Sequence, residues 1–381
     1  MTSGGLEAGQ GTGERRHRRA PVHAGRGAPI PSRCRCVAPV LRQSGPVGGV
    51  ANQWDGEGMH TSSSSITRDR RPLGRTGLFV TALCLGTSAL GSMPRLYGYP
   101  VDEERALATL RAAFASPINF LDTSNGYADG ASERLVGAVL SELGGLPRGF
   151  VVGTKIDPLE TDGQLDFSGA RAACSVEESM SRMGLDHLQL VYLHDPERIT
   201  FEEAMADDGP VARLRALRDQ GVIDHLGVAG GPIDLLRRFI ATGEFEVVVS
   251  HNRYTLLDRS AIPLLEECAE AGVAVVNGAP FGGGMLAKGP EVQPRYAYRQ
   301  TPEVVRERAA AMQDACARYG IPLAAAALQF SVRQPLITST IVGVTHPERV
   351  AETLRHLDLA IPRALWDELD DLAPPEALWL F

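Results

Sequence analysis

Four side chains that can carry out acid–base chemistry stand at or just after the ends of predicted strands: Asp122, Tyr127, Lys155 and His194. A tyrosine hydroxyl is a weak acid with an ordinary pKa of about 10. A lysine ammonium beside it is expected to lower that pKa, and an aspartate paired with the lysine keeps the ammonium charged. A histidine at the same place can hydrogen-bond a substrate oxygen. Such a group can exchange a proton with an alcohol or carbonyl oxygen while a nicotinamide carries the hydride.

The elements that must bring these residues together are strands and helices in regular alternation. Short β-branched and aromatic runs predict eight strands, and periodic apolar stretches predict helices between them. The predicted strands cover residues 79–85, 119–123, 150–155, 188–194, 225–229, 246–251, 273–277 and 339–344. The predicted helices cover residues 102–115, 132–143, 168–183, 211–220, 233–242, 261–271, 302–319 and 347–357, with an extra apolar helix over 323–333.

This alternation favours an α/β fold of the (β/α)8 TIM barrel type, formed as a single domain over residues 72–381. Most predicted strands are continuous apolar runs, such as Val247-Val248-Val249, which is typical of parallel strands covered on both faces. A doubly wound sheet competes with the barrel, but it predicts a G-x-G-x-x-G loop after the first strand, and none is present. Active sites of such barrels lie at the carboxyl ends of the strands, so the four residues should meet there. The stretch before the first strand is expected to form a small hairpin over the other end.

The segment from Asp122 to Gly137, which begins Asp-Thr-Ser-Asn-Gly-Tyr, resembles the signature region of the aldo/keto reductase superfamily. Five further motifs continue the resemblance, which covers residues 72–372: Gly153-Thr154-Lys155, Leu193-His194, the run of residues 252–257 (Asn-Arg-Tyr-Thr-Leu-Leu), and the loops 279–286 and 343–349. The Asn-Arg-Tyr-Thr-Leu-Leu run is similar to that of the sugar-oxidising branch, the D-threo-aldose 1-dehydrogenases, with pyridoxal 4-dehydrogenase nearby. The resemblance implies that Tyr127 is the general acid/base, that Lys155 and Asp122 tune it, and that His194 orients the substrate.

The resemblance also implies a nicotinamide cofactor, with two departures from the family pattern. The family binds the carboxamide with a Ser-Asn pair after the fifth strand, where this chain has Ala229-Gly230. Asn252, at the end of the sixth strand, is therefore expected to hold the carboxamide. The family's stacking aromatic after the seventh strand is replaced by Gly278, and Phe281 is expected to take its place.

Two loops are expected to hold the phosphates of the cofactor. Small residues at Gly282 and Gly283 would let the backbone approach the pyrophosphate. The loop after the last strand and the following helix N-terminus favour anions. NADP-preferring relatives carry a Lys and a Ser where this chain has Gly343 and Val344, whereas Arg349 stands at the family's Arg position. This pattern favours NAD over NADP, with use of both left open.

The activity that the resemblance implies is oxidation of an aldose at C1 to its lactone. Alternatives are a general aldehyde or ketone reductase, a pyridoxal dehydrogenase, and a non-catalytic barrel that binds nicotinamide nucleotide and regulates a partner. An unrelated phosphate-binding isomerase or aldolase could use Lys155 as a Schiff-base lysine, but pairing with Asp122 should keep that lysine charged. No metal-ligand cluster is visible, so no metal is predicted.

Composition and charge argue against some classes of binding partner. The 381 residues carry a net charge of −8, and the mildly acidic balance argues against nucleic acid. No run of 18 apolar residues predicts a membrane span. The six cysteines include no C-x-x-C pair and are interpreted as reduced thiols. We expect a cytoplasmic monomer or small homo-oligomer that binds a small-molecule sugar or aldehyde, and neither nucleic acid nor a membrane.

The first 58 residues differ from the rest of the chain. They hold 12 Gly, 5 Pro and 8 Arg, with no Lys and four acidic residues. Such composition, without hydrophobic periodicity, is typical of disorder. We expect a disordered extension over residues 1–58, or an over-extended start with Met59 as the biological initiator.

Overall fold

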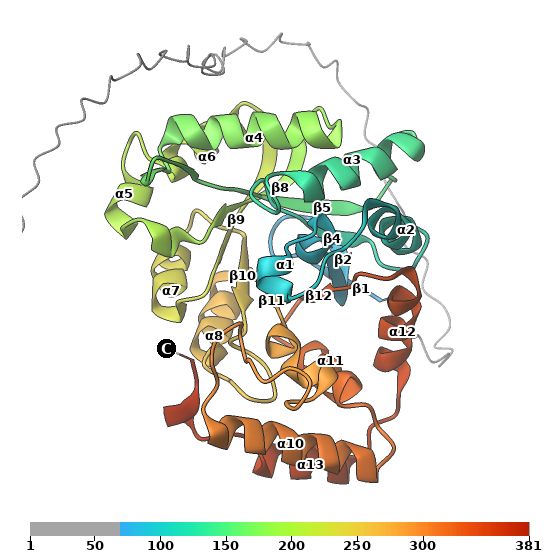
Figure 1. The fold of residues 1–381 in the computed structure, drawn as a ribbon. Helices are drawn as coiled ribbons and strands as arrows, with labels where there is room; N and C mark the ends of the chain where they lie inside the picture. Colours follow the sequence, from blue (N-terminus) through green and yellow to red (C-terminus); the bar gives the residue numbers. More distant parts are fainter. Residues whose placement is uncertain (1–68, 381) are drawn as a thin grey trace, which may run out of the picture. The chain divides into compact units, whose positions relative to one another are not determined.

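Eight parallel strands of the chain close into a barrel (Figure 1). The structure is a computed structural model that describes residues 69–380, so the extension predicted for residues 1–58 lies outside the described residues. Around the barrel each strand pairs with the next, and the last pairs with the first. The barrel strands are β3 (Leu83–Gly86), β4 (Phe120–Asp122), β5 (Val151–Ile156), β8 (Leu188–His194), β9 (Ile223–Gly230), β10 (Val247–His251), β11 (Ala274–Gly278) and β12 (Ser339–Gly343). The predicted (β/α)8 fold class is confirmed.

Helices lie outside the strands, as Figure 1 shows. All nine predicted helices are present within one or two residues of their predicted bounds: α2 (Glu103–Phe114), α3 (Ala131–Glu142), α4 (Gly169–Met183), α6 (Pro210–Asp219), α7 (Ile233–Ala241), α8 (Ile262–Ala271), α10 (Glu303–Arg318), α11 (Leu323–Val332) and α12 (Pro347–Asp358). Four helices were not predicted: α1 (Pro94–Tyr97), α5 (Phe201–Met205), α9 (Met285–Lys288) and α13 (Arg363–Asp371). Three of these have four or five residues, too few for a periodic signal.

The first predicted strand, over residues 79–85, is wrong as a single strand. It divides into β2 (Phe79–Thr81), which pairs antiparallel with β1 (Arg70–Pro72), and β3, which enters the barrel. The predicted hairpin is therefore present and begins inside the segment assigned to the barrel. The side chains of Leu73 and Val80 pack against the barrel interior, and the Asn119 amide bonds the hairpin backbone at Thr81 and Phe79. The hairpin thereby closes the amino-terminal end of the barrel.

A second hairpin follows β5 and was not predicted. It joins β6 (Leu159–Thr161) to β7 (Gln164–Asp166) through Asp162-Gly163. Both loop residues have positive φ, 51° and 75°. Asp-Gly in a two-residue loop is a strong hairpin signal, so the sequence contained the information.

Alternation along the strands decides which side chains enter the barrel. In β8, Leu190 and Tyr192 belong to the buried interior, and in β5 Val151 does so. Successive side chains of a strand point to opposite faces, so residues at even spacing from these share their direction. Lys155 and His194 therefore point inward at the carboxyl-terminal mouth. The same rule places Asp122 inward, two residues beyond Phe120.

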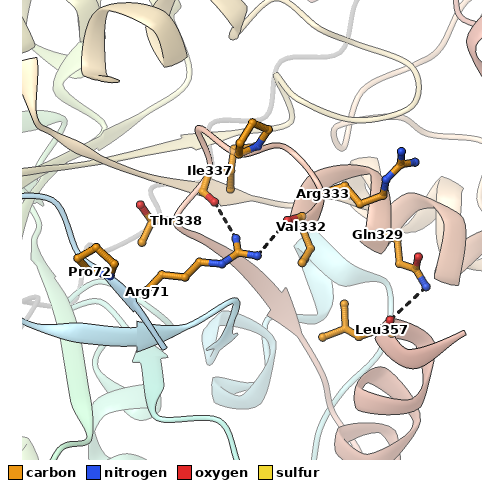
Figure 2. Close-up of a pocket in the computed structure, with 9 residues that line it drawn as sticks. Arg71, Pro72, Gln329, Val332, Arg333, Ile337, Thr338 and Leu357 are labelled. Carbon is orange, nitrogen blue, oxygen red and sulfur yellow. Dashed lines mark hydrogen bonds between the residues drawn. The ribbon is translucent and has the colours of Figure 1, made fainter. Parts of the chain in front are cut away.

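A cavity of about 530 Å³ lies at the opposite end of the barrel (Figure 2). It is bordered by the β1 hairpin, by the turn before β12 and by α11 and α12. The Arg71 guanidinium donates to the carbonyl oxygens of Ile337 at 3.0 Å and Val332 at 3.3 Å. Both contacts tether the hairpin to the barrel wall. The cavity therefore lies between the hairpin and the helices, and it is separate from the strand ends that carry the four predicted catalytic residues.

Within residues 69–380, no helix is both long and apolar enough to cross a membrane. Cys84, Cys268 and Cys316 are buried, and burial raises the pKa of the Cys268 thiol to about 12. Cys34 and Cys36 lie outside the described residues.

Candidate active site

Lys155 lies at the centre of the candidate site. Its ammonium nitrogen is 2.6 Å from Asp122 Oδ1, 2.7 Å from the Thr123 carbonyl and 2.9 Å from Tyr127 Oη. Lys155 and Asp122 are almost fully buried, with side-chain exposures of 2% and 4%. The pair forms because β4 and β5 are parallel neighbours, which puts both carboxyl ends at one edge. A buried charge needs such a partner, since an isolated one would lose its hydration without compensation.

His194 completes the predicted set of four. It ends β8, the neighbour of β5, and its ring meets the Tyr127 ring edge to face at a centroid distance of 5.7 Å. Asp122, Tyr127, Lys155 and His194 therefore come together at the barrel mouth from three adjacent strands and one loop. Their catalytic roles belong to the proposed function below.

The pKa of Tyr127 differs from the expectation drawn from the sequence. Burial and the nearby Asp122 charge raise this pKa well above its ordinary value, whereas the neighbouring lysine was expected to lower it. The physical reason is that phenolate loses hydration on burial, and the Asp122 charge beside Lys155 opposes the benefit of the ammonium. Tyr127 is therefore protonated at neutral pH.

Asp157 and Ser124 belong to this site and were missed. Asp157 Oδ1 is 2.7 Å from His194 Nδ1, and Asp157 Oδ2 accepts from the Gly126 N–H at 2.7 Å. The Ser124 hydroxyl donates to the same carboxylate oxygen and lies 3.1 Å from His194 Nδ1. The position of Asp157 two residues after Lys155 was the available signal, because such residues share a strand face.

A further group of titratable residues adjoins His194. Asp195, Glu197 and His251 each offer one atom that could bind a metal ion, and these atoms lie within 4.8 Å of one another. Glu197 accepts from the Gly231 N–H at 3.3 Å, and burial raises its pKa. The prediction from the sequence that the protein binds no metal stays a prediction.

A buried polar network supports the loop that carries Tyr127. Arg182 donates to the Asn125 carbonyl and to Glu133, both at 3.0 Å. Glu133 has no exposed surface, and Thr154 also donates to it at 2.6 Å. Glu133 therefore links α3, α4 and β5 beneath the loop. Helix α3 begins after Gly130, which is its N-cap residue.

The predicted carboxamide ligand Asn252 lies just beyond β10, with φ of 60°. Its Nδ2 is 3.2 Å from His251 Nδ1, and its buried Oδ1 has no hydrogen-bond partner in residues 69–380. His251, rather than Asn252, shares the inward face of β10 with Val249. The role of Asn252 stays a prediction.

The glycine loop after β11 is packed more closely than expected. A Cβ on Gly282 would lie 2.1 Å from the Tyr296 ring, and a Cβ on Gly283 would lie 3.1 Å from the Tyr298 backbone nitrogen. Both glycines have positive φ. The structure thus gives these glycines a packing reason, and their predicted approach to a pyrophosphate stays a prediction. Phe281 is partly buried against the core beside them.

The predicted phosphate loop is open. A Cβ on Gly343 would have no heavy atom within 4 Å. Helix α12 begins at Pro347, and no side chain caps its N-terminus. Arg349 stands exposed in its first turn. A helix start without a side-chain cap and with open space beside it can accept a phosphate. This part of the barrel rim therefore fits the cofactor that the sequence predicts.

Comparisons with known proteins identify the family and the fold. A family model described as the aldo/keto reductase family matches residues 82–374. A D-threo-aldose 1-dehydrogenase from a Pseudomonas species is 32% identical over 318 residues, covering 77% of this chain and 94% of that protein. Pyridoxal 4-dehydrogenase of Microbacterium luteolum is 30% identical over 346 residues, covering 82% and 98%. The structure of an aldo-keto reductase from Bacillus halodurans in its holo form matches at a TM-score of 0.66 and 21% identity, covering 82% and 98%, and supports the fold.

Proposed function

This chain belongs to the aldo/keto reductase family, and from that premise we propose that it interconverts an alcohol and a carbonyl with a nicotinamide nucleotide as cofactor. The observation that carries the proposal is the contact of one buried ammonium, Lys155 Nζ, with both Asp122 and Tyr127 Oη. Acid–base catalysis needs a proton donor held in place beside the reacting oxygen. Tyr127 is that donor, because it is partly exposed at the mouth and bonded to Lys155 behind it.

Tyr127 transfers the proton, and Lys155 and Asp122 stabilise the charge that results. In reduction, Tyr127 Oη gives its proton to the oxygen of the carbonyl substrate, and the phenolate that remains is stabilised by Lys155. In oxidation, that phenolate accepts the proton of the substrate hydroxyl. Asp122 keeps Lys155 charged in both directions. The nicotinamide, when bound, supplies or takes up the hydride.

The rim of the barrel offers the groups for such a cofactor. The open backbone at Gly343 and the uncapped start of α12 suit a phosphate, and Arg349 adds a positive charge there. Gly343 and Val344 stand where NADP-preferring relatives carry a Lys and a Ser, so we infer a preference for NAD. Asn252, Phe281, Gly282 and Gly283 are the remaining proposed cofactor contacts.

The proposed substrate is an aldose of the L-fucose or D-threo type, oxidised at C1 to a lactone. Support comes from the similarity to a D-threo-aldose 1-dehydrogenase over most of both chains. A general aldehyde reductase is the second candidate. The raised pKa of Tyr127 favours it, because a phenol that stays protonated is set to donate.

The test measures absorbance of the reduced nicotinamide with the full chain. NAD or NADP is combined with L-fucose, D-arabinose, L-galactose or pyridoxal, and reduced cofactor is combined with an aromatic aldehyde. We expect turnover of a sugar with NAD, rising with pH because oxidation needs the phenolate. Tyr127→Phe should turn the sugar over at least about 100-fold more slowly, because acid–base catalysis usually contributes that much to the rate. Tyr319→Phe, an exposed tyrosine at the end of α10, is the matched control and should keep full activity.

Each result separates the candidates. Turnover only of aldehyde with reduced cofactor would assign a carbonyl reductase. Cofactor binding without any turnover, equal in wild type and Tyr127→Phe, would contradict the catalytic proposal and support a regulatory barrel.

A further inference from the structure

The histidine of the candidate site has a carboxylate partner of its own. His194 Nδ1 lies 2.7 Å from Asp157 Oδ1, and both side chains are about 15% exposed. The other Asp157 oxygen accepts from the Gly126 N–H and from the Ser124 hydroxyl. One carboxylate therefore holds the histidine ring with one oxygen and the loop that carries Tyr127 with the other.

This contact determines which nitrogen of His194 carries a proton. A carboxylate only accepts hydrogen bonds, so Nδ1 must be protonated while it is bonded to Asp157. Nε2 then has a lone pair in the neutral ring and an N–H in the charged ring. The nearest carboxylate to Nε2 is Asp195, whose Oδ1 is 3.7 Å away and beyond hydrogen-bond reach.

The surroundings of His194 favour the charged ring. The charged and titratable groups that face it are Asp122, Lys155, Asp157, Asp195, Glu197 and His251. Burial opposes the charge and so does Lys155, but the charges of Asp157 and Asp195 and the hydrogen bond that His194 donates to Asp157 outweigh both, and the pKa of His194 is raised. Burial also acts on Asp157, yet His194, Ser124 and Gly126 lower the pKa of that carboxyl far below its usual range. Both shifts favour the charged forms, so the contact is an ion pair whenever the His194 ring is protonated.

We propose that Asp157 is a positioning residue, which holds His194 as an imidazolium with Nδ1 bonded and Nε2–H free to donate to the substrate oxygen. This inference rests on the proposed function, in which that oxygen takes up or releases negative charge next to Tyr127. A charged donor stabilises a developing alkoxide better than a neutral one. The rings of Tyr127 and His194 meet edge to face, so both reach the same mouth. Asp157 itself lies behind the ring.

The direct test is the titration of the His194 ring nitrogens by ¹⁵N NMR in the full chain. The signals are assigned by their loss in His194→Gln. In wild type we expect protons on both nitrogens at pH 7 and a titration midpoint above the ordinary value of about 6.5. In Asp157→Asn the midpoint should fall by about one pH unit or more, since removal of a nearby opposite charge has that effect. Asp162→Asn is the matched control, because Asp162 is an exposed acid in the next hairpin, and it should leave the midpoint unchanged.

A second readout separates positioning from mere structural support. Asp157→Asn should lower kcat about tenfold or more at pH 7 with little change in KM, and the inflection of its pH profile that follows the protonation of His194 should move with the ring midpoint. An Asp157→Asn midpoint equal to that of wild type overturns the proposal. So does a wild-type ring that is neutral at pH 7 or protonated only on Nε2, a result that needs no variant to fold.

The titration also distinguishes this inference from the proposed function. If no substrate turns over, the proposed function fails, yet the ring titration still shows whether Asp157 holds the proton on His194. If turnover is present and the kcat and pH profile of Asp157→Asn match those of wild type, the proposed function stands and the positioning role is refuted.

Discussion

Removal of the buried carboxylate of Glu133 is predicted to destabilise the barrel strongly. Glu133 has no exposed surface and accepts from Arg182 at 3.0 Å and from Thr154 at 2.6 Å. Glu133→Ala would leave the buried Thr154 hydroxyl without its acceptor and would remove one of the two carboxylates that face the Arg182 guanidinium, the other being that of Glu178 at 3.5 Å. Breaking a buried ion pair in this way costs about 3–5 kcal/mol. The Arg182 side chain is 22% exposed, so water can reach it, and Glu133→Ala should lower the free energy of unfolding by about 3 kcal/mol.

Glu133→Gln separates charge from shape. The amide keeps the volume and one acceptor oxygen, but the bond from Arg182 loses its charged partner. Hydrogen bonds to charged groups contribute about 1.5–3 kcal/mol and neutral ones about 0.5–1.5 kcal/mol, so the loss should be about 1 kcal/mol. The predicted order of stability is wild type, then Glu133→Gln, then Glu133→Ala.

The assay is urea unfolding followed by circular dichroism, with the free energy of unfolding obtained by linear extrapolation. Glu142→Ala is the matched control, since Glu142 lies on the same helix and pairs with Arg111 at 2.7 Å, but both side chains are about half exposed. Exposed pairs contribute little because water solvates both partners. Equal losses in Glu133→Ala and Glu142→Ala would refute the reasoning that burial makes Glu133 important.

Two further predictions concern other buried groups. Tyr192 is fully buried and its hydroxyl has no hydrogen-bond partner in residues 69–380, so Tyr192→Phe should raise the free energy of unfolding by about 1 kcal/mol, and a less stable variant would contradict this. The pKa of His194 is raised in the folded protein, so the charged ring stabilises the fold below about pH 6.5, and this stabilisation is lost as pH rises through the raised pKa. The pKa of Asp157 is lowered, so its carboxylate stabilises the fold above about pH 4, and this stabilisation is lost as pH falls through the lowered pKa. The difference in melting temperature between wild type and Asp157→Asn should therefore be widest between about pH 4 and 6.5, and a constant difference across pH would count against the ion pair.

Signals that act over short stretches of chain were enough to predict most of the fold. Apolar periodicity predicted nine helices to within one or two residues, because a helix buries one face whatever packs against it. The division of residues 79–85 into β2 and β3 was not predictable in this way. Both pieces are apolar, and only their different pairing partners, β1 and β12, separate them.

The candidate site divides in the same manner. Asp122, Tyr127, Lys155 and His194 were predicted because strand ends of a parallel barrel must share one mouth. Asp157 was missed although it lies two residues after Lys155, because its partner His194 is 37 residues away and only closure of β5 against β8 brings them together.

Sequence by itself determined the alternation of barrel strands and helices and the four residues at the mouth, since these follow from local pattern and chain direction. Tertiary structure alone decided the state of those residues. The raised pKa of Tyr127, the carboxylate behind His194 and the packing of Tyr296 onto Gly282 all depend on burial and on which distant side chains become neighbours. Burial and proximity are properties of the closed barrel, and no short stretch of the chain encodes them.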